Sequence, residues 1–345
     1  METELALTNF EDSTRETVRK AVTALQAGDV VALPTETVYG LGADALNPAA
    51  VEKIFEAKKR PHFDPLIVHI GHKDAFHQLA EVPPDIAKTV TQLVETFWPG
   101  PLTIVLPKKP IVPDIVTGGL DTVAVRQCDH PVFHRIIKSF GGPIAAPSAN
   151  IFGRLSPTSA PAVMDQLEGR IPLVVDGGAC GRGLESTIVR ILPGDKKPII
   201  EILRPGPITN DDLKKFGKVV FAERNADVED SVPEAPGMLA NHYAPNKPLR
   251  LLTGPQDFKA EEGKRYALLS YRGQAKDGYL GMHEWEEVTV LSPGSGRVAE
   301  AGIRLFHALR ALDQNENIDE IIAEPVPDRA VGKAILDKLR RASVK

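Results

Sequence analysis

The first strand and the loop that follows it constrain the fold of this chain most. Residues 30–33 are apolar, and Pro34 then ends the strand abruptly. The following loop is rich in hydroxyl groups, carries Glu36, and closes on Gly40 and Gly42. Ligands of α/β proteins usually bind where a strand ends in small polar groups. The alternative is an ordinary turn whose threonine side chains bond the local backbone.

The order of the remaining elements predicts two α/β domains, as a length of 345 residues also favours. Strand follows strand without a helix in several places of the first domain, so we expect a mixed sheet there. The apolar pattern dissolves over residues 222–247, which we interpret as a linker. The expected domains are therefore residues 1–221 and residues 248–345, the second a smaller, doubly wound Rossmann-like unit.

Charge and composition exclude several classes of protein. A net charge of −5 argues against a dedicated nucleic-acid coat. Cys128 and Cys180 lie far apart and form no zinc pattern, and the acidic N-terminus lacks the apolar core of a secretory signal. The isolated cysteines fit a reducing compartment, so we expect a cytoplasmic protein, and no run approaches the length of a membrane span.

Common catalytic motifs are absent from the sequence. It lacks GxxxxGK[ST], GxSxG and HExxH, which argues against a P-loop, an α/β-hydrolase nucleophile and a zincin site. The glycine-rich stretch 177–183 precedes a strand, so it does not fit a dinucleotide fingerprint. Residues 293–297 open a helix, where a plain N-cap is favoured over an anion site.

Polar and cationic side chains end several of the predicted strands. Clustered cations repel one another unless an anion joins them, and phosphates together with a carboxylate substrate would satisfy this set. The residues concerned are Thr37, His69, Arg126, Ser148, Asn150, Ser186 and Arg204, with Lys58 and Arg60 preceding one of the strands. The pattern indicates nucleotide-dependent chemistry, but it does not name the reaction.

A set of motifs in fixed order resembles the YrdC-like threonylcarbamoyl-AMP synthase family. The resemblance covers about residues 13–215, and residues 236–238 and 242–245 look like the linker of the long, two-domain form. The motifs are Pro34-Thr35-Glu36-Thr37-Val38-Tyr39-Gly40-Leu41, Lys58-x-Arg60-Pro61, Pro65-Leu66-Ile67-Val68-His69, Trp98-Pro99-Gly100-Pro101-Leu102-Thr103, Val125-Arg126, Pro147-Ser148-Ala149-Asn150 and Glu185-Ser186-Thr187-Ile188-Val189.

The resemblance implies a twisted, mixed-sheet catalytic domain with a basic cavity. It also implies that L-threonine, bicarbonate and ATP react to threonylcarbamoyl-AMP and pyrophosphate. The product would supply a partner transferase that makes threonylcarbamoyladenosine in tRNA. The alternative is that the basic cavity binds RNA directly, in an RNA-binding or ribosome-maturation module; the acidic total charge and the lack of aromatic residues among the cations argue against it.

The resemblance also assigns residues to each substrate. Threonine would be bound by Thr37, His69, Arg126, Ala146 and Ser186. ATP with its Mg²⁺ would be bound by Lys58, Arg60, Asp64, Thr122, Ser148, Asn150, Ser156, Arg204 and Tyr243. Lys58, Arg60, Ser148 and Asn150 would be the catalytic residues, and protein ligands for the metal are not expected. Many relatives carry asparagine in place of Asp64, whose carboxylate would disfavour a nearby phosphate.

The second half of the linker predicts a lid over the nucleotide. Residues 236–238 are turn formers with a methionine, and His242 and Tyr243 are large amphipathic rings. Such side chains are poor choices for a solvated spacer but good ones for covering a cavity. We therefore expect Tyr243 to lie over ATP and Gly237 to act as a bending point.

Overall fold

The computed structural model describes residues 2–222, 233, 235–238 and 243–343. By internal contacts the chain divides into two compact units, each described here by itself. The first comprises Met1–Phe152, Pro157–Gly181 and Glu185–Met238. The second comprises Leu239–Lys345 together with two short segments, Gly153–Ser156 and Arg182–Leu184.

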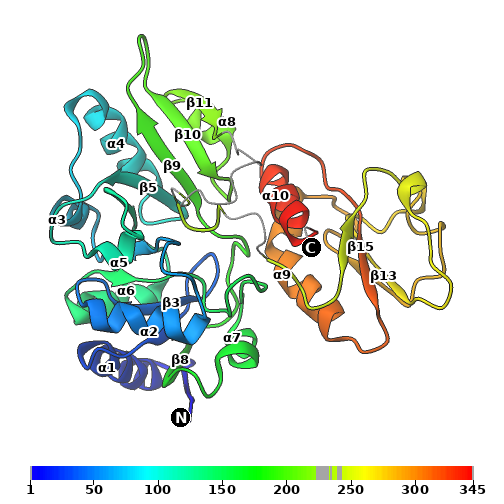
Figure 1. Ribbon diagram of the computed structural model, residues 1–345, viewed down its shortest axis with the longest axis horizontal. Coiled ribbons are helices and arrows are strands. Elements are labelled where there is room, and N and C mark those ends of the chain that lie inside the picture. The colour runs from blue at the N-terminus through cyan, green and yellow to red at the C-terminus, as the bar shows by residue number, and fades with distance from the viewer. Residues whose placement is uncertain (1, 223–232, 234, 239–242, 344–345) are drawn as a thin grey trace. The chain divides into compact units, whose positions relative to one another are not determined.

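A mixed sheet of 11 strands forms the centre of the first unit, which confirms the predicted fold class (Figure 1). Its spatial order is β1-β8-β2-β3-β7-β4-β6-β5-β9-β10-β11. The strands are β1 (Glu4–Leu7), β2 (Val31–Leu33), β3 (Gly40–Asp44), β4 (Ile67–His69), β5 (Leu102–Pro107), β6 (Thr122–Arg126), β7 (Ile144–Ala145), β8 (Leu173–Asp176), β9 (Thr187–Leu192), β10 (Ile199–Arg204) and β11 (Lys218–Phe221).

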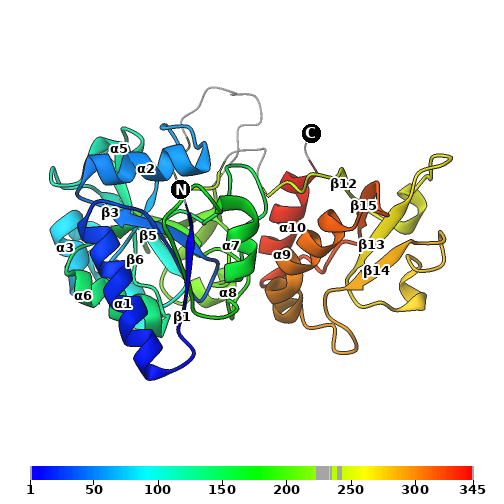
Figure 2. The same cartoon turned by 90° about the horizontal axis from the view of Figure 1, so that it is seen from below.

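Helices of the first unit pack on both faces of this sheet. Figure 2 shows α2 and α5 on one side of β3, β5 and β6, and α1 and α6 on the other. The helices are α1 (Glu11–Gln26), α2 (Pro48–Lys58), α3 (Phe76–Leu79), α4 (Pro84–Phe97), α5 (Asp114–Thr117), α6 (Pro131–Phe140), α7 (Ala160–Leu167) and α8 (Asn210–Leu213). Among the residues described in either unit, no helix combines the length and the apolar character needed to cross a membrane.

Capping side chains determine where the first two long helices begin. The side chain of Asn47 accepts hydrogen bonds from the backbone of Ala49 and Ala50, and Pro48 begins α2, as the sequence predicts. Ser13-Thr14-Arg15-Glu16 has the pattern of a capping box and predicts that the first helix opens there, which is wrong in position. Helix α1 begins at Glu11 rather than after Ser13, and the Ser13 hydroxyl instead accepts a hydrogen bond from the Phe10 amide at 3.0 Å.

The register of β4 against β6 places the predicted site residues on one face of the sheet. Ile67 pairs with Ala124 and His69 pairs with Arg126, so these four side chains share a face because side chains alternate along a strand. Ile67 and Ala124 belong to a small apolar cluster that also contains Val105, Ile188 and Leu203, whereas the intervening Val68 and Val125 belong to the larger core under α2 and α4. The candidate site therefore borders the small cluster.

The second unit is a parallel sheet of four strands with two helices. Its order is β12-β15-β13-β14, where β12 is Leu249–Leu251, β13 is Tyr266–Ser270, β14 is Glu287–Val290 and β15 is Glu320–Ala323. Helices α9 (Val298–Gln314) and α10 (Gly332–Ala342) contact each other and lie on the same side of β13 and β15 (Figure 1). Loop residues Phe258 and Trp285 pack against Tyr266 and Leu268 in a separate cluster. The unit is thus Rossmann-like in its parallel sheet, but the expectation that it is doubly wound is wrong, because α9 and α10 lie on one face.

Candidate active site

The loop after β2 combines a self-contained turn with a side chain that reaches the sheet. Thr35 Oγ1 accepts the backbone N–H groups of Thr37 at 3.0 Å and Val38 at 3.2 Å, which is the local bonding expected of an ordinary turn. The Thr37 hydroxyl, in contrast, accepts a hydrogen bond from Arg126 Nη1 at 3.1 Å. The local turn is therefore confirmed for Thr35, whereas Thr37 reaches the end of β6, and ligand binding by this loop stays a prediction.

Arg126 is buried at the end of β6 and is held on three sides. Its Nε donates to the carbonyl of Gly100 at 3.1 Å, its Nη1 to Thr37, and its Nη2 to the carboxylate of Glu36. The other Glu36 oxygen accepts from Cys128 Sγ at 3.0 Å. Although burial alone would raise it, the pKa of Glu36 is lowered by the Arg126 charge and by these hydrogen bonds, so Glu36 is a carboxylate at neutral pH.

His69 lies beside Arg126 as a neutral imidazole. Its ring lies against Phe133 of α6, with 4.9 Å between the ring centroids. Burial, reinforced by the Arg126 charge, lowers the pKa of His69 to about 3. His69 Nδ1 is buried and has no hydrogen-bond partner among the residues that the structure describes. An unsatisfied buried nitrogen at this place is suited to receive a polar ligand group.

Ser186 links Thr103 of β5 to Arg204 of β10 through hydrogen bonds of its hydroxyl group. Its hydroxyl lies 2.7 Å from Thr103 Oγ1, and it accepts from Arg204 Nη2 at 3.1 Å. Arg204 also donates to the carbonyl of Ser186 and, at 3.2 Å, to that of Pro236. A residue of the predicted linker thus contacts a predicted ATP residue. Ala146, the remaining predicted threonine residue, donates its amide to the carbonyl of Ile67 at 2.9 Å.

Lys58 anchors the segment that carries Ser148 and Asn150. Its Nζ donates to the backbone carbonyls of both residues at 2.5 Å, so the predicted catalytic residues Lys58, Ser148 and Asn150 do lie together. Complete burial, with the charge of Arg60 adding to it, lowers the pKa of Lys58 well below its ordinary value. The contacts are to main-chain oxygens, and they fix the loop after β7 relative to the end of α2.

Arg60 is turned towards its own loop. Its guanidinium pairs with the Asp64 carboxylate at 2.8 Å and donates to the carbonyls of Asp64 and Pro65. The Phe152 ring lies beneath it, 5.9 Å from the guanidinium carbon. Asp64, which the sequence marks as unusual, therefore serves as a counter-ion of Arg60 in this structure, as a carboxylate beside a buried cation should.

The remaining predicted ATP residues lie elsewhere in the fold. Thr122 begins β6, at the opposite end of the strand from Arg126. Ser156 and Tyr243 belong to the second unit, where Tyr243 is buried at a positive φ of 65° and packs on Phe306 with 5.6 Å between ring centroids. His242 lies outside the described residues.

The sequence reasoning missed several side chains that hold the site. Glu36 lies in the loop after β2, and the sequence predicts no role for it. Cys128 and Thr103 complete the polar contacts of Glu36 and Ser186. Its position between Thr35 and Thr37 is the local feature of the sequence that could have indicated a role for Glu36. Cross-strand partners such as Thr103 follow from register, which a sequence does not show.

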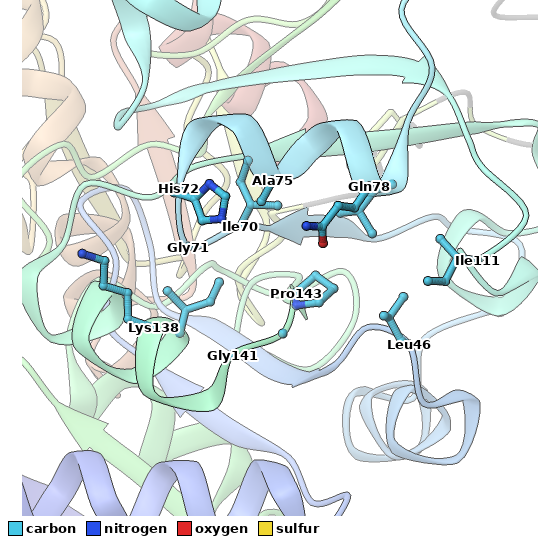
Figure 3. A pocket seen from close by; sticks show the side chains of 13 residues that line it. Leu46, Ile70, Gly71, His72, Ala75, Gln78, Ile111, Lys138, Gly141 and Pro143 are labelled. Carbon is cyan, nitrogen blue, oxygen red and sulfur yellow. The ribbon is translucent and has the colours of Figure 1, made fainter.

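A separate cavity of about 270 Å³ is lined by Ile70 and Gly71, which directly follow β4, and its lining includes none of the predicted site residues (Figure 3). Ile70, Ile137 and Pro143 form its apolar wall, and His72, Gln78 and Lys138 supply its polar side chains. Because these residues carry none of the predicted contacts with threonine or ATP, the cavity is distinct from the candidate site.

Comparison with known protein families accounts for both units. Residues 23–206, more than half of the chain, match the Sua5–YciO–YrdC family, described as "Telomere recombination". Residues 208–344 match the family described as "Threonylcarbamoyl-AMP synthase, C-terminal domain". The mixed sheet and its polar face thus define an α/β protein of the Sua5–YciO–YrdC class with an added C-terminal domain.

Relatives that match along their whole length identify the family more closely. The threonylcarbamoyl-AMP synthase of Pyrococcus abyssi is 39% identical over 94% of both chains, and that of Bacillus subtilis is 40% identical over 94% of this chain and 92% of its own. The crystal structure of Pyrococcus abyssi Sua5 complexed with L-threonine superimposes with a TM-score of 0.84 at 37% identity, covering 99% of this chain and 98% of that one. The chain belongs to the threonylcarbamoyl-AMP synthase family, in its long two-domain form.

Proposed function

We propose that this enzyme converts L-threonine, bicarbonate and ATP into threonylcarbamoyl-AMP and pyrophosphate. The observation that carries the proposal is the similarity to enzymes of this name along almost the whole chain. We further propose that it acts in the cytoplasm and that its product supplies the transferase that makes threonylcarbamoyladenosine in tRNA. The alternative, an RNA-binding or ribosome-maturation module, is not favoured, because the relatives are named as enzymes.

Threonine would bind on the face that carries His69 and Arg126. The Arg126 guanidinium offers its remaining N–H groups to the substrate carboxylate, while Glu36, Thr37 and Gly100 keep its plane fixed. Neutral His69 offers at the same place a ring nitrogen that has no partner among the described residues. Positioning of this kind lowers the barrier by reducing the entropy lost when the substrates meet.

The chemistry then needs one nucleophilic step on carbon and one on phosphorus. The threonine amine attacks CO₂ and releases a proton, or attacks bicarbonate with loss of water, and in either case gives a carbamate. An oxygen of the carbamate then attacks the α-phosphorus of ATP, and pyrophosphate leaves. Lys58, Arg60 and Arg204 would neutralise the charge that develops on the phosphates. Exclusion of water protects the carbamate and the mixed anhydride from hydrolysis.

Mg²⁺ would enter with ATP and would be held mainly by its phosphates. Within the described part of the chain, no group of three or more His, Cys, Asp and Glu side chains could hold a metal ion. Asp64 is paired with Arg60. This donor set fits Mg²⁺, which commonly keeps water and phosphate ligands and needs few protein ones. The ion would supply charge neutralisation to the phosphates.

Pyrophosphate release tests the proposal directly. Incubation with ATP, Mg²⁺, bicarbonate and threonine should release pyrophosphate, and omission of threonine should stop it. Tight RNA binding without threonine-dependent turnover would contradict the proposal and favour the alternative module.

A further inference from the structure

We propose that Glu36 makes the threonine site selective for a zwitterionic α-amino acid over the hydroxy-acid anion of the same shape. The inference rests on the proposed function, because it concerns the same site. It gives a role to a side chain that the predicted set of threonine contacts does not include. Glu36 acts here as a specificity-determining residue, through the charge that it contributes to the site.

The contacts of Glu36 place a full negative charge beside Arg126. One carboxylate oxygen accepts from Arg126 Nη2 and the other from Cys128 Sγ at 3.0 Å. The side chain of Glu36 is 12% exposed and that of Arg126 is 4% exposed, so solvent screens the pair only weakly. Each carboxylate oxygen retains acceptor capacity, since two lone pairs are available on each.

The titratable groups around this ion pair are uncharged. Burial raises the pKa of Cys128 and raises that of Cys180 to about 12, so both are thiols at neutral pH. Burial lowers the pKa of His69 to about 3 and also lowers the pKa of His130, so both imidazoles are neutral. Asp129, near His130, is exposed to solvent. The Glu36–Arg126 pair therefore leaves this end of the site with no net charge.

Arg204 is the next cation along the same face. Arg204 donates a hydrogen bond to the Ser186 hydroxyl, which also contacts the hydroxyl of Thr103. The proposed partners of Arg204 are the phosphates of ATP. Removing the charge of Glu36 leaves the contacts of Arg204 unchanged. The contribution of Arg204 to ligand affinity therefore cancels when the ligand preference of the wild type is compared with that of Glu36→Gln.

Charge balance then decides which ligand this site accepts. A zwitterion adds no net charge to a neutral buried pair, whereas a hydroxy-acid anion adds one uncompensated negative charge beside Glu36. Burying an unpaired charge is costly, and like charges at close range repel. Arg126 alone would attract any carboxylate, so the discrimination against the anion comes from Glu36 as a repulsive element.

The test compares L-threonine with (R)-3-hydroxybutyrate, which is threonine without its ammonium group. Calorimetry should show that the wild-type enzyme binds threonine at least tenfold more tightly than 3-hydroxybutyrate. In Glu36→Gln, which keeps the size and an acceptor oxygen but loses the charge, this preference should shrink by about tenfold or more. Glu36→Asp, which keeps the charge, should retain most of the preference.

The matched control is Glu201→Gln. Glu201 forms a two-bond ion pair with Arg190 across β9 and β10, so the variant removes a carboxylate of the same kind away from the candidate site. Its preference between the two ligands should equal that of the wild type. If Glu36 had only a structural role, Glu36→Gln would weaken the binding of both ligands equally and leave the ratio of their affinities unchanged.

Each outcome bears on a different claim. An unchanged ratio in Glu36→Gln would overturn the inference while leaving the proposed function intact. A wild-type enzyme that does not prefer threonine over 3-hydroxybutyrate would overturn the inference even if Glu36→Gln failed to fold. Failure of the wild type to bind threonine at all would instead contradict the proposed function.

Discussion

Individual residues of the site are held by more contacts than their predicted roles require. Arg126 uses three of its N–H groups within the protein, and Lys58 uses its ammonium group on two backbone carbonyls. Such contacts fix the side chains before substrate arrives, so less entropy is lost on binding. The resemblance identified these residues, but their partners follow from tertiary register and were not predicted.

Arg126→Ala should weaken threonine binding far more than ATP binding. Two charge-assisted hydrogen bonds of roughly 1.5–3 kcal/mol each would be lost, which corresponds to a weakening of about a hundredfold or more. Calorimetric titration with each ligand checks this. Arg190→Ala, which removes a cation from the Glu201 pair, is the control and should change neither affinity. Equal loss of both affinities in Arg126→Ala would count against the assignment.

His69 should make the enzyme less stable in mild acid. Its pKa is about 3 in the folded protein against an ordinary 6.5, so the unfolded chain binds more protons between these values. The stabilising contribution is complete above pH 6.5 and is lost as the pH falls towards 3. Urea unfolding at pH 7 and pH 5 should show an extra loss of about 2 kcal/mol in the wild type compared with His69→Gln. The same loss in both proteins would contradict this explanation.

At the scale of elements, strands with clear apolar runs were predicted well and those defined by pairing were not. The apolar run at 266–270 predicts a strand with the bounds that β13 has, and Asn47 before Pro48 predicts the cap of α2 that the structure shows. Residues 40–42, expected to close a loop, instead begin β3, which pairs antiparallel with β2 and β7. Glycine is unfavourable in strands, so only tertiary pairing explains this one. Gly42 fits because an added Cβ would lie 2.8 Å from Leu33 Cδ1.

Arg60, in the loop that follows α2, should contribute to the reaction with ATP. Arg60→Ala should lower kcat/KM for ATP by tenfold or more, since an Arg that contacts a transferring phosphate commonly contributes at least this much. The threonine affinity should change little, whereas the unfolding midpoint should fall, because Asp64 would lose its buried counter-ion. An ATP dependence equal to that of the wild type would show that Arg60 acts only as the partner of Asp64.

Residues 235–238 of the predicted linker pack against other residues of the first unit. Ala235 is fully buried in the small cluster with Ile67 and Val105, and Met238 packs against it. Pro236 accepts a hydrogen bond from Arg204 at 3.2 Å. This arrangement is what a covering segment requires; its opening and closing remain a prediction.

Loss of the Tyr243 ring should let the labile product hydrolyse. Tyr243→Ala should keep the first unit folded but lower the yield of intact adenylate per pyrophosphate released, because water would reach the anhydride. Tyr243→Phe separates the ring from its hydroxyl. Limited proteolysis of residues 234–247 should slow when ATP and threonine are present. Equal cleavage with and without ligands, together with a normal yield in Tyr243→Ala, would show that the segment is not a lid.

For the whole molecule, the predicted class was confirmed because it depends on the order of many elements. The mixed sheet of the first unit and the parallel sheet of the second both follow from how strands and helices alternate along the chain. The short segments 153–156 and 182–184, which group with the second unit, were not predicted. Their place depends on contacts between residues far apart in sequence, which local patterns do not encode.

The proposed function requires that this chain joins threonine, bicarbonate and ATP in one product. The most direct measurement uses ¹³C-bicarbonate and analyses the products by mass spectrometry. We expect an adenylate that contains threonine and one labelled carbon, formed in equal amount to pyrophosphate and only when threonine is present. Pyrophosphate release without the label in the adenylate, or an adenylate without threonine, would contradict the claim.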